Sequence, residues 1–306
     1  MSSALLFTQC LQRDFVDRLG PHDPLPNRLH VGAAESARLL GPDARTGPVA
    51  QLFGWARRQP TDALEVVHLR DAHDAADARQ AAHLDRFGAH CLRGSPGADL
   101  VAGLGEAVPD RPNERFVDCL TLNDFEDTTL ASVLAPWLAA PAPPRAGVVG
   151  VWTDAKVTFL LYELATRCGL TELATCSALT ASASRTQHFN ALSQLQRLLG
   201  VRVFDSVGDF TRWLVPDGPA VVVPPLPPGV GPTVTGAPLA AADADVVAGL
   251  FRESAEVELR PLAGGFSGAA VYRALSRDAL GHDEAPTVLK LGPRATLAAE
   301  RAAFAR

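Results

Sequence analysis

The chain has 306 residues, 47% of them hydrophobic, and a net charge of −6 from 28 basic and 34 acidic side chains. This length predicts about two domains, each with enough apolar side chains for its own core. The composition excludes a disordered or fibrous chain. The acidic balance, without a basic run, excludes an electrostatic surface for nucleic acid or anionic membranes. We therefore expect a small-molecule ligand or a protein as partner.

The cysteine content indicates the cellular compartment. The five cysteines are too few and too scattered for a disulfide framework, and none forms a C-x-x-C pair. They predict reduced thiols in a cytoplasmic protein. The first residues lack the basic and apolar regions of a signal peptide, and no apolar run approaches the roughly 20 residues of a membrane span.

Short apolar runs alternate with segments of helical spacing over the first two thirds of the chain. The runs predicted as buried strands are residues 4–8, 64–69, 115–120, 147–152, 171–176 and 201–204. The segments predicted as helices are 31–57, 128–138, 154–168 and 186–199. This alternation predicts an α/β fold, a Rossmann-like three-layer α/β/α arrangement with a mostly parallel six-stranded sheet. In such sheets ligands bind beyond the carboxyl ends of the strands.

Prolines and glycines crowd the segment after Trp213, which cannot carry a regular helix or a central strand. We therefore predict a domain over residues 1–214, a linker over 215–239 and a partial, β-rich domain over 240–306. In this last part, residues 240–252 predict a short helix. The stretch that follows predicts a strand, a glycine turn and two further strands. The sequence stops inside a helix-like run, which we interpret as the front portion of a longer protein.

Distinctive polar motifs follow the predicted strands of the first domain. The first strand runs into CLQRDFVD, the second into RDAHD, the third into CLTLNDFEDTTL and the fourth into VWTDAKVTF. In this order the motifs resemble those of the isochorismatase-like cysteine hydrolases, and of nicotinamidases in particular. The resemblance covers roughly residues 4–210 and is supported by HCLRGSPGADL and ASASRTQHFNAL. It implies a scaffold for hydrolysing small amides.

The three catalytic positions of that family hold other residues here. The resemblance places a cysteine nucleophile in the first turn after the fourth strand, where a helix dipole lowers the thiol pKa, and this chain has Lys156 there. The family's general base, an aspartate, is replaced by Cys10, and its lysine is replaced by Cys119. The base that should take the thiol proton is therefore missing.

The resemblance also implies which backbone faces the substrate. It places the substrate and oxyanion side of the site at Val151 and Trp152, together with Asp14 of the first motif. In the family the peptide before the residue matching Trp152 is commonly cis. The large indole of Trp152 is expected to fill part of the pocket.

A second set of residues matches the metal site of nicotinamidases. That site consists of an Asp-x-His pair and a later histidine just before a cysteine. Here Asp71 and His73 form the pair, His90 precedes a cysteine, and His83 lies between them as a further ligand. One carboxylate and two or three imidazoles suit Zn²⁺, Fe²⁺ or Mn²⁺ with an open position. The alternative is a common loop dipeptide and a solvated His83.

The last part of the chain carries a different pattern. A turn containing Gly265 and Gly268 is followed by Lys290 on a predicted strand and then by Glu300. Backbone N–H groups of such a turn can cover phosphates, a strand lysine can reach their oxygens, and a helix glutamate can hold that lysine. This resembles the opening of the N-lobe of protein-kinase-like and aminoglycoside-phosphotransferase-like domains, which implies ATP and Mg²⁺ only if a whole such domain is present. A plain glycine-rich hairpin is the alternative.

These patterns lead to two hypotheses about function. The first is a catalytically degenerate isochorismatase-like domain that binds a ligand or a protein and regulates the kinase-like part. The second is an active hydrolase of a nicotinamide-like amide, which uses the thiol of Cys119 or Cys10, with a pKa lowered by Lys156, or a metal-bound water. Isochorismatase-like domains often form homo-oligomers, so the resemblance also implies self-association.

Overall fold

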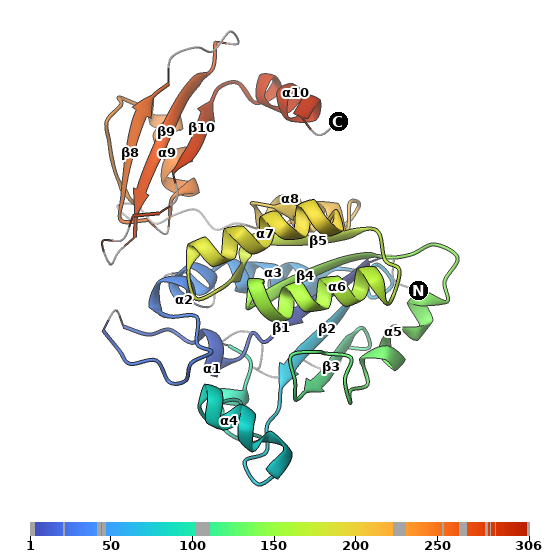
Figure 1. Ribbon diagram of the computed structural model, residues 1–306. Helices are drawn as coiled ribbons and strands as arrows, with labels where there is room; N and C mark the ends of the chain where they lie inside the picture. Colours follow the sequence, from blue (N-terminus) through green and yellow to red (C-terminus); the bar gives the residue numbers. More distant parts are fainter. Residues whose placement is uncertain are drawn as a thin grey trace. The chain divides into compact units, whose positions relative to one another are not determined.

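The computed structural model (Figure 1) describes residues 4–20, 22–41, 44, 47–101, 111–222, 231–252, 254–262, 268–278, 281, 283–284 and 286–304. The chain divides into two compact units, Met1–Val223 and Pro224–Arg306. No helix within the described ranges is long and apolar enough to cross a membrane.

The first unit is built on a six-stranded parallel sheet with the order β3-β2-β1-β4-β5-β6. Its strands are β1 (Ala4–Gln9), β2 (Leu64–Asp71), β3 (Glu114–Cys119), β4 (Arg145–Val151), β5 (Leu173–Ala181) and β6 (Arg202–Phe204). This confirms the predicted sheet. The strand order reverses between β1 and β4, and ligands bind beside such a switch point in doubly wound folds.

Helices cover both faces of this sheet (Figure 1). One face carries α2 (Ala33–Leu40), α3 (Pro48–Arg58) and α8 (Val207–Leu214), and the other carries α5 (Leu130–Leu138), α6 (Thr158–Thr166) and α7 (Arg185–Leu199). Leu6 of β1 packs in the first core, while Leu5 and Phe7 pack in the second. Burial on both faces explains why the strands are continuous apolar runs in the sequence.

Shorter helices lie in the loops between these elements. They are α1 (Arg13–Val16), η1 (Ala78–Gln80), α4 (Ala81–Phe87), η2 (Pro96–Ala98) and the π-helical turn η3 (Thr153–Val157). All but η3 lie in loops after β1 and β2, and η3 directly follows β4. They therefore lie at the carboxyl side of the sheet, where the site is built.

The prediction of a single helix over residues 31–57 is wrong, because this segment forms two separate helices, α2 and α3. Helix α2 ends at Gly41, whose φ of +68° lies in the left-handed region that glycine adopts readily. Helix α3 begins at Pro48, which has no N–H to donate and is therefore suited to a first helical position.

The second unit contains a four-stranded mixed sheet with the order β10-β9-β8-β7. Its elements are β7 (Thr233–Thr235), α9 (Ala241–Leu250), β8 (Glu256–Pro261), β9 (Ala270–Arg277), β10 (Thr287–Leu291) and α10 (Arg294–Phe304). Strand β7 pairs in parallel with β8, and the other pairings are antiparallel. Val247 of α9 packs against Val257 and Leu259 in a small core. The predicted helix and strands are present, and β7 lies inside the segment predicted as linker.

Gly150 fixes the contact between β1 and β4 at the switch point. Its φ is +116°, and a Cβ atom at this position would overlap the backbone carbonyl oxygen of Gln9. A larger residue is therefore excluded both by its backbone conformation and by the close approach of the neighbouring strand.

We expect Gly150→Ala to lower the free energy of unfolding by at least about 3 kcal/mol, because strain and overlap act together. The control is Gly169→Ala, at φ +67° with no atom near its would-be Cβ, which should cost only about 1 kcal/mol. Urea denaturation of both variants measures the difference. Equal losses would contradict the close approach.

Candidate functional site

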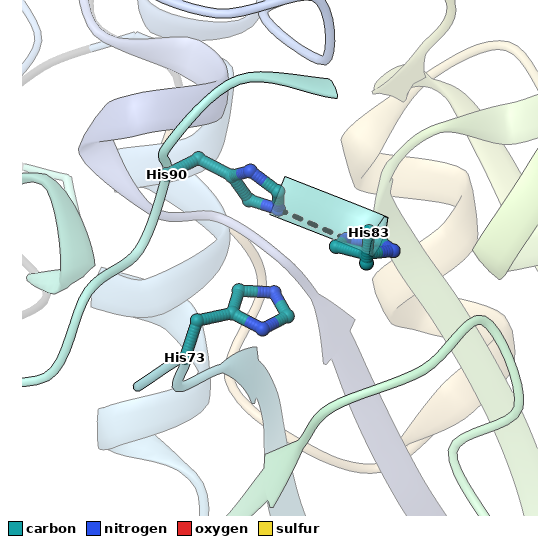
Figure 2. A group of neighbouring side chains, drawn as sticks. All are labelled: His73, His83 and His90. Carbon is teal, nitrogen blue, oxygen red and sulfur yellow. Dashed lines mark hydrogen bonds between the residues drawn. The ribbon is translucent and has the colours of Figure 1, made fainter. Parts of the chain in front are cut away.

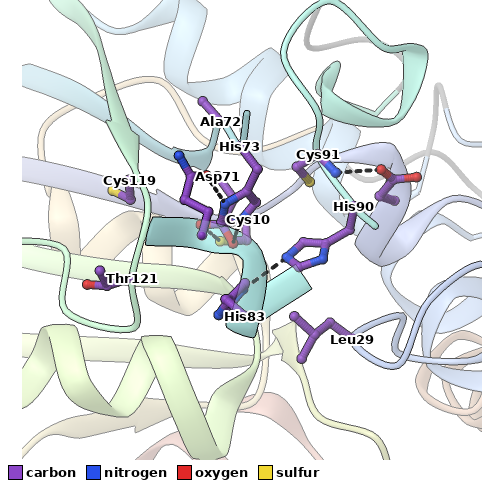
Figure 3. Close-up of polar contacts among 12 residues, drawn as sticks. Cys10, Leu29, Asp71, Ala72, His73, His83, His90, Cys91, Cys119 and Thr121 are labelled. Carbon is purple, nitrogen blue, oxygen red and sulfur yellow. Dashed lines mark hydrogen bonds and ion pairs between the residues drawn. The ribbon is translucent and has the colours of Figure 1, made fainter. Parts of the chain in front are cut away.

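The loops at the carboxyl ends of the first four strands bring the three substituted positions together. Cys10 follows β1, Cys119 ends β3, and Lys156 lies in η3 after β4. The ammonium group of Lys156 is close enough to both thiols for electrostatic interaction. Figure 3 shows Cys10 beside Asp71 with Cys119 nearby. The three positions that the family pattern indicates therefore also lie close together in the structure.

Lys156 forms a buried ion pair at the centre of this group. Its Nζ lies 2.6 Å from Oδ1 of Asp71 and 3.1 Å from Oδ1 of Asp124. The side chains are 7%, 7% and 0% exposed for Lys156, Asp71 and Asp124. Sequence reasoning did not identify Asp124, although it lies in the motif that follows the third strand. Its partner is far away in sequence, so no local pattern indicates the contact.

The ion pair fixes the charge of this region. Burial disfavours a charged lysine, but the carboxylates of Asp124 and Asp71 outweigh it and hold the pKa of Lys156 well above its usual value. Burial also acts to raise the pKa of Asp71, and the Lys156 ammonium outweighs that effect, so its pKa is lowered. The pKa of Asp124 is instead raised, chiefly by burial. Lys156 and Asp71 thus hold each other in their charged forms.

The thiols are not activated by this lysine. Burial raises the pKa of Cys10 far above its ordinary value, the charge of Asp71 raises it further, and the opposing effect of Lys156 is smaller. Burial likewise raises the pKa of Cys119 and of Cys91. The ammonium acts to lower the thiol pKa values, as expected, but desolvation of the thiolate dominates, so the expected activation of a thiol does not follow.

Backbone N–H groups on the expected oxyanion side already donate hydrogen bonds within the protein. The peptide between Val151 and Trp152 is cis, as the resemblance implies. The half-buried indole of Trp152 donates a hydrogen bond of 2.7 Å to the carbonyl of Leu29. The N–H groups of Ala155 and Val157 both donate to the carbonyl of Trp152, at 3.1 Å. These donors are therefore already satisfied.

Asp14 has a structural contact. Its Oδ2 atom accepts a hydrogen bond of 2.6 Å from the backbone N–H of Cys91. Cys91 and Cys10 both have left-handed backbones, with φ of +45° and +49°, which is uncommon for residues other than glycine. The Asp14 carboxylate thus anchors the strained segment that begins with His90.

Three imidazoles converge beside the ion pair. His73 follows β2, His83 lies in α4 and His90 lies in the loop after α4. Their candidate ligand nitrogens all lie within 4.8 Å of one another, and Nε2 of His83 lies 3.3 Å from Nε2 of His90. Figure 2 shows the rings turned toward one another. We call these residues the histidine trio.

The hydrogen bonds of Gln80 determine which nitrogen of His73 carries the proton. Gln80 Oε1 accepts from the backbone N–H of Asp74 at 3.1 Å, and its Nε2 donates to Asp77 Oδ2 at 3.0 Å. Because this fixes the amide orientation, the 3.0 Å contact between His73 Nδ1 and Gln80 Oε1 requires a proton on Nδ1. In the neutral ring the buried Nε2 of His73 then presents a lone pair. It has no hydrogen-bond partner among the described residues, and Oδ2 of Asp71 lies 3.6 Å away.

His90 is arranged in the same way. Its Nδ1 donates a hydrogen bond of 2.6 Å to the carbonyl of Gly88, so its Nε2 also presents a lone pair toward the trio. Burial lowers the pKa of His90, and burial together with the other two histidines lowers that of His83 to about 4. Neutral imidazoles are what a metal ion requires.

The histidine trio fits a divalent metal. Two nitrogens at 2.0–2.1 Å from a tetrahedral metal stand about 3.3 Å apart, as those of His83 and His90 do. The orphaned lone pair of His73 supplies a third ligand. Asp71, predicted as a ligand, lies beside the histidine trio and not within it. Its Oδ2 is 3.6 Å from Nε2 of His73, while its Oδ1 is paired with Lys156.

In the second unit, the structure pairs two of the predicted residues. Lys290 Nζ lies 2.5 Å from Glu300 Oε2, which joins β10 to α10. Gly268 has a left-handed backbone with φ of +72°. Gly265 lies outside the described residues.

Comparisons with known proteins support the fold alone. No protein-family model matches the chain, and no curated protein matches it either. Solved structures do match it. A nicotinamidase/pyrazinamidase from Bacillus subtilis aligns with 67% of this chain and 100% of its own, at 20% identity and a TM-score of 0.52. The first unit therefore has the isochorismatase fold.

Two further structures agree with this assignment. A pyrazinamidase/nicotinamidase from Streptococcus mutans is 22% identical, with a TM-score of 0.53 over 65% of this chain and 99% of its own. An isochorismatase-like hydrolase from Alkaliphilus metalliredigens is 22% identical, with a TM-score of 0.50 over 68% of this chain and 97% of its own. The coverage corresponds to a complete domain of this isochorismatase fold.

We expect the buried thiols to be unreactive in the native protein, because their raised pKa values leave almost no thiolate. At pH 8, a chromogenic disulfide reagent should label Cys168, the partly exposed cysteine, and should reach the other four only after unfolding. Mass mapping of the labelled peptides identifies the sites. Rapid native labelling of Cys10 or Cys119 would contradict this account.

We expect Lys156→Met to cost about 3–5 kcal/mol of stability, because it leaves buried carboxylates without a counter-ion. The matched control is Arg13→Met, which removes an exposed ion pair with Asp17 and should cost less than about 1 kcal/mol. Chemical denaturation at pH 7 compares the two. A loss of similar size in both variants would show that the Lys156 pair contributes little.

Proposed function

We propose that the first unit is a metal-binding module for a small ligand that has lost thiol-dependent amide hydrolysis. The observation that carries this proposal is the buried ion pair of Lys156 with Asp71, which stands where a hydrolase of this fold needs its nucleophile. A protonated amine cannot attack a carbonyl carbon, and the neighbouring thiols of Cys10 and Cys119 are protonated.

The histidine trio supports the binding half of this proposal. His73, His83 and His90 would hold a divalent ion such as Zn²⁺, Fe²⁺ or Mn²⁺. When bound, the ion would act as a Lewis acid toward a donor atom of the ligand. Gln80 and the Gly88 carbonyl accept hydrogen bonds from Nδ1 of His73 and His90, which leaves Nε2 of each ring available to bind the ion. Neither contact involves Cys10, Cys119 or Lys156.

The test combines metal content with turnover. We expect the purified protein to bind one Zn²⁺ per chain, to lose it in His73→Ala, and to hydrolyse nicotinamide and a panel of small amides no faster than His73→Ala does. His22→Ala, which changes an exposed histidine, controls for a general effect of substitution. Turnover that requires His73 or Cys119 would overturn the proposal in favour of an active hydrolase.

A second function is proposed for the unit from Pro224 to Arg306. The ion pair of Lys290 with Glu300 supports a kinase-like N-lobe, because a strand lysine held by a helix glutamate is the arrangement that positions nucleotide phosphates. In this proposal the metal-binding unit regulates a phosphotransferase-like part of the same protein.

We expect Lys290→Ala and Glu300→Gln each to weaken binding of a fluorescent ATP analogue at least fivefold, measured with Mg²⁺ on the whole chain. Val288→Ala changes an exposed residue of the same strand and should leave binding unchanged. Binding that is insensitive to both Lys290→Ala and Glu300→Gln, or no binding at all, would favour a glycine-rich hairpin without a nucleotide site.

A further inference from the structure

Resting on the proposed function, we propose that Lys156 withholds Asp71 from the metal, leaving a three-imidazole centre that keeps its full charge for an anionic ligand. Lys156 is then a positioning residue of the metal centre. In this role it replaces the nucleophile that the fold otherwise carries at this position.

The first step of the argument is the orientation of Asp71. Its backbone is clamped by Gln12, which accepts from the Asp71 N–H at 2.7 Å and donates to the Asp71 carbonyl at 2.7 Å. These two buried hydrogen bonds fix the backbone of Asp71 and so restrict where its carboxylate can lie. From there, Oδ1 accepts from Lys156 at 2.6 Å, and the Cys10 thiol lies 3.6 Å from the same oxygen.

The second step is the limited reach of Asp71 toward the histidine trio. Its Oδ2 lies 3.6 Å from Nε2 of His73. The group of candidate ligand atoms that lie close to one another contains His73, His83 and His90 without Asp71. The carboxylate thus borders one imidazole of the trio while its charge is directed toward the ammonium.

The third step concerns the competition between two cations. A buried carboxylate shared by an ammonium and a dication would hold two positive charges side by side in a region of low dielectric. Lys156 is anchored by Asp124 as well as by Asp71, so it is not free to retreat. The less costly arrangement leaves Asp71 with Lys156 and the metal with neutral imidazoles.

The consequence is the chemical class of the ligand. Three neutral imidazoles leave a divalent ion with its whole charge, whereas a carboxylate ligand would cancel half of it. His73 and His90 are buried, and His83 is partly exposed, so the open position is reached from the His83 side. A small carboxylate or another anion is therefore the preferred occupant.

The experiment uses Co²⁺ as a visible probe of coordination in the whole chain. We expect Asp71→Asn to change the Co²⁺ dissociation constant less than threefold, because Asp71 is not a ligand. Lys156→Met should tighten Co²⁺ binding at least tenfold and shift the visible bands, because Asp71 is then released to the metal. The double variant Lys156→Met/Asp71→Asn should return to the wild-type affinity. Asp124→Asn, which leaves Lys156 on Asp71, is the matched control and should not tighten binding.

The anion is tested in the same spectra. Sodium acetate should shift the Co²⁺ bands of the wild type, and at least fivefold more acetate should be needed to produce the same shift in Lys156→Met.

If Lys156→Met does not fold, the affinity of Asp71→Asn for Co²⁺ tests the inference. A tenfold or greater loss of affinity in that variant would make Asp71 a ligand and overturn the inference. Unchanged affinity in folded Lys156→Met overturns the inference alone. A wild type that binds neither Co²⁺ nor Zn²⁺ overturns the proposed function together with it.

Discussion

The buried ion pair between Lys156 and Asp71 is the interaction on which the site depends. An ammonium group can remain charged in a protein interior only if carboxylates accompany it, and here Asp71 and Asp124 do so. The same burial that makes the pair necessary keeps the thiol of Cys10 protonated. The lysine thus keeps Asp71 charged, and burial keeps the neighbouring thiol unreactive.

The histidine trio is organised independently of that pair. The imidazole of His73 is oriented by Gln80, and that of His90 by the Gly88 carbonyl. Neither contact involves Cys10, Cys119 or Lys156. Among the residues that the structure describes, Asp71 touches both halves, since its two carboxylate oxygens face Lys156 and His73. It is through this residue that a change at Lys156 would reach the histidine trio.

The sequence was sufficient to predict the parallel sheet, because strands buried on both faces are continuous apolar runs. The positions of Cys10, Cys119 and Lys156 were also predictable, since they follow strand ends in a family order. The break between α2 and α3 was missed although Gly41 and Pro48 mark it. The contact of Lys156 with Asp124 could not be predicted, because it joins two loops through the fold and neither residue has a local pattern for it. The thiol pKa was wrongly predicted because a nearby ammonium was weighed without the burial that opposes it.

The most direct test is a crystal structure of the zinc-loaded protein, with zinc located by its anomalous scattering. The account predicts zinc bound by Nε2 of His73, Nε2 of His90 and a nitrogen of His83, with Lys156 still paired to Asp71. Zinc that is absent from the histidine trio, or that is bound by Asp71 after Lys156 has moved away, would contradict it.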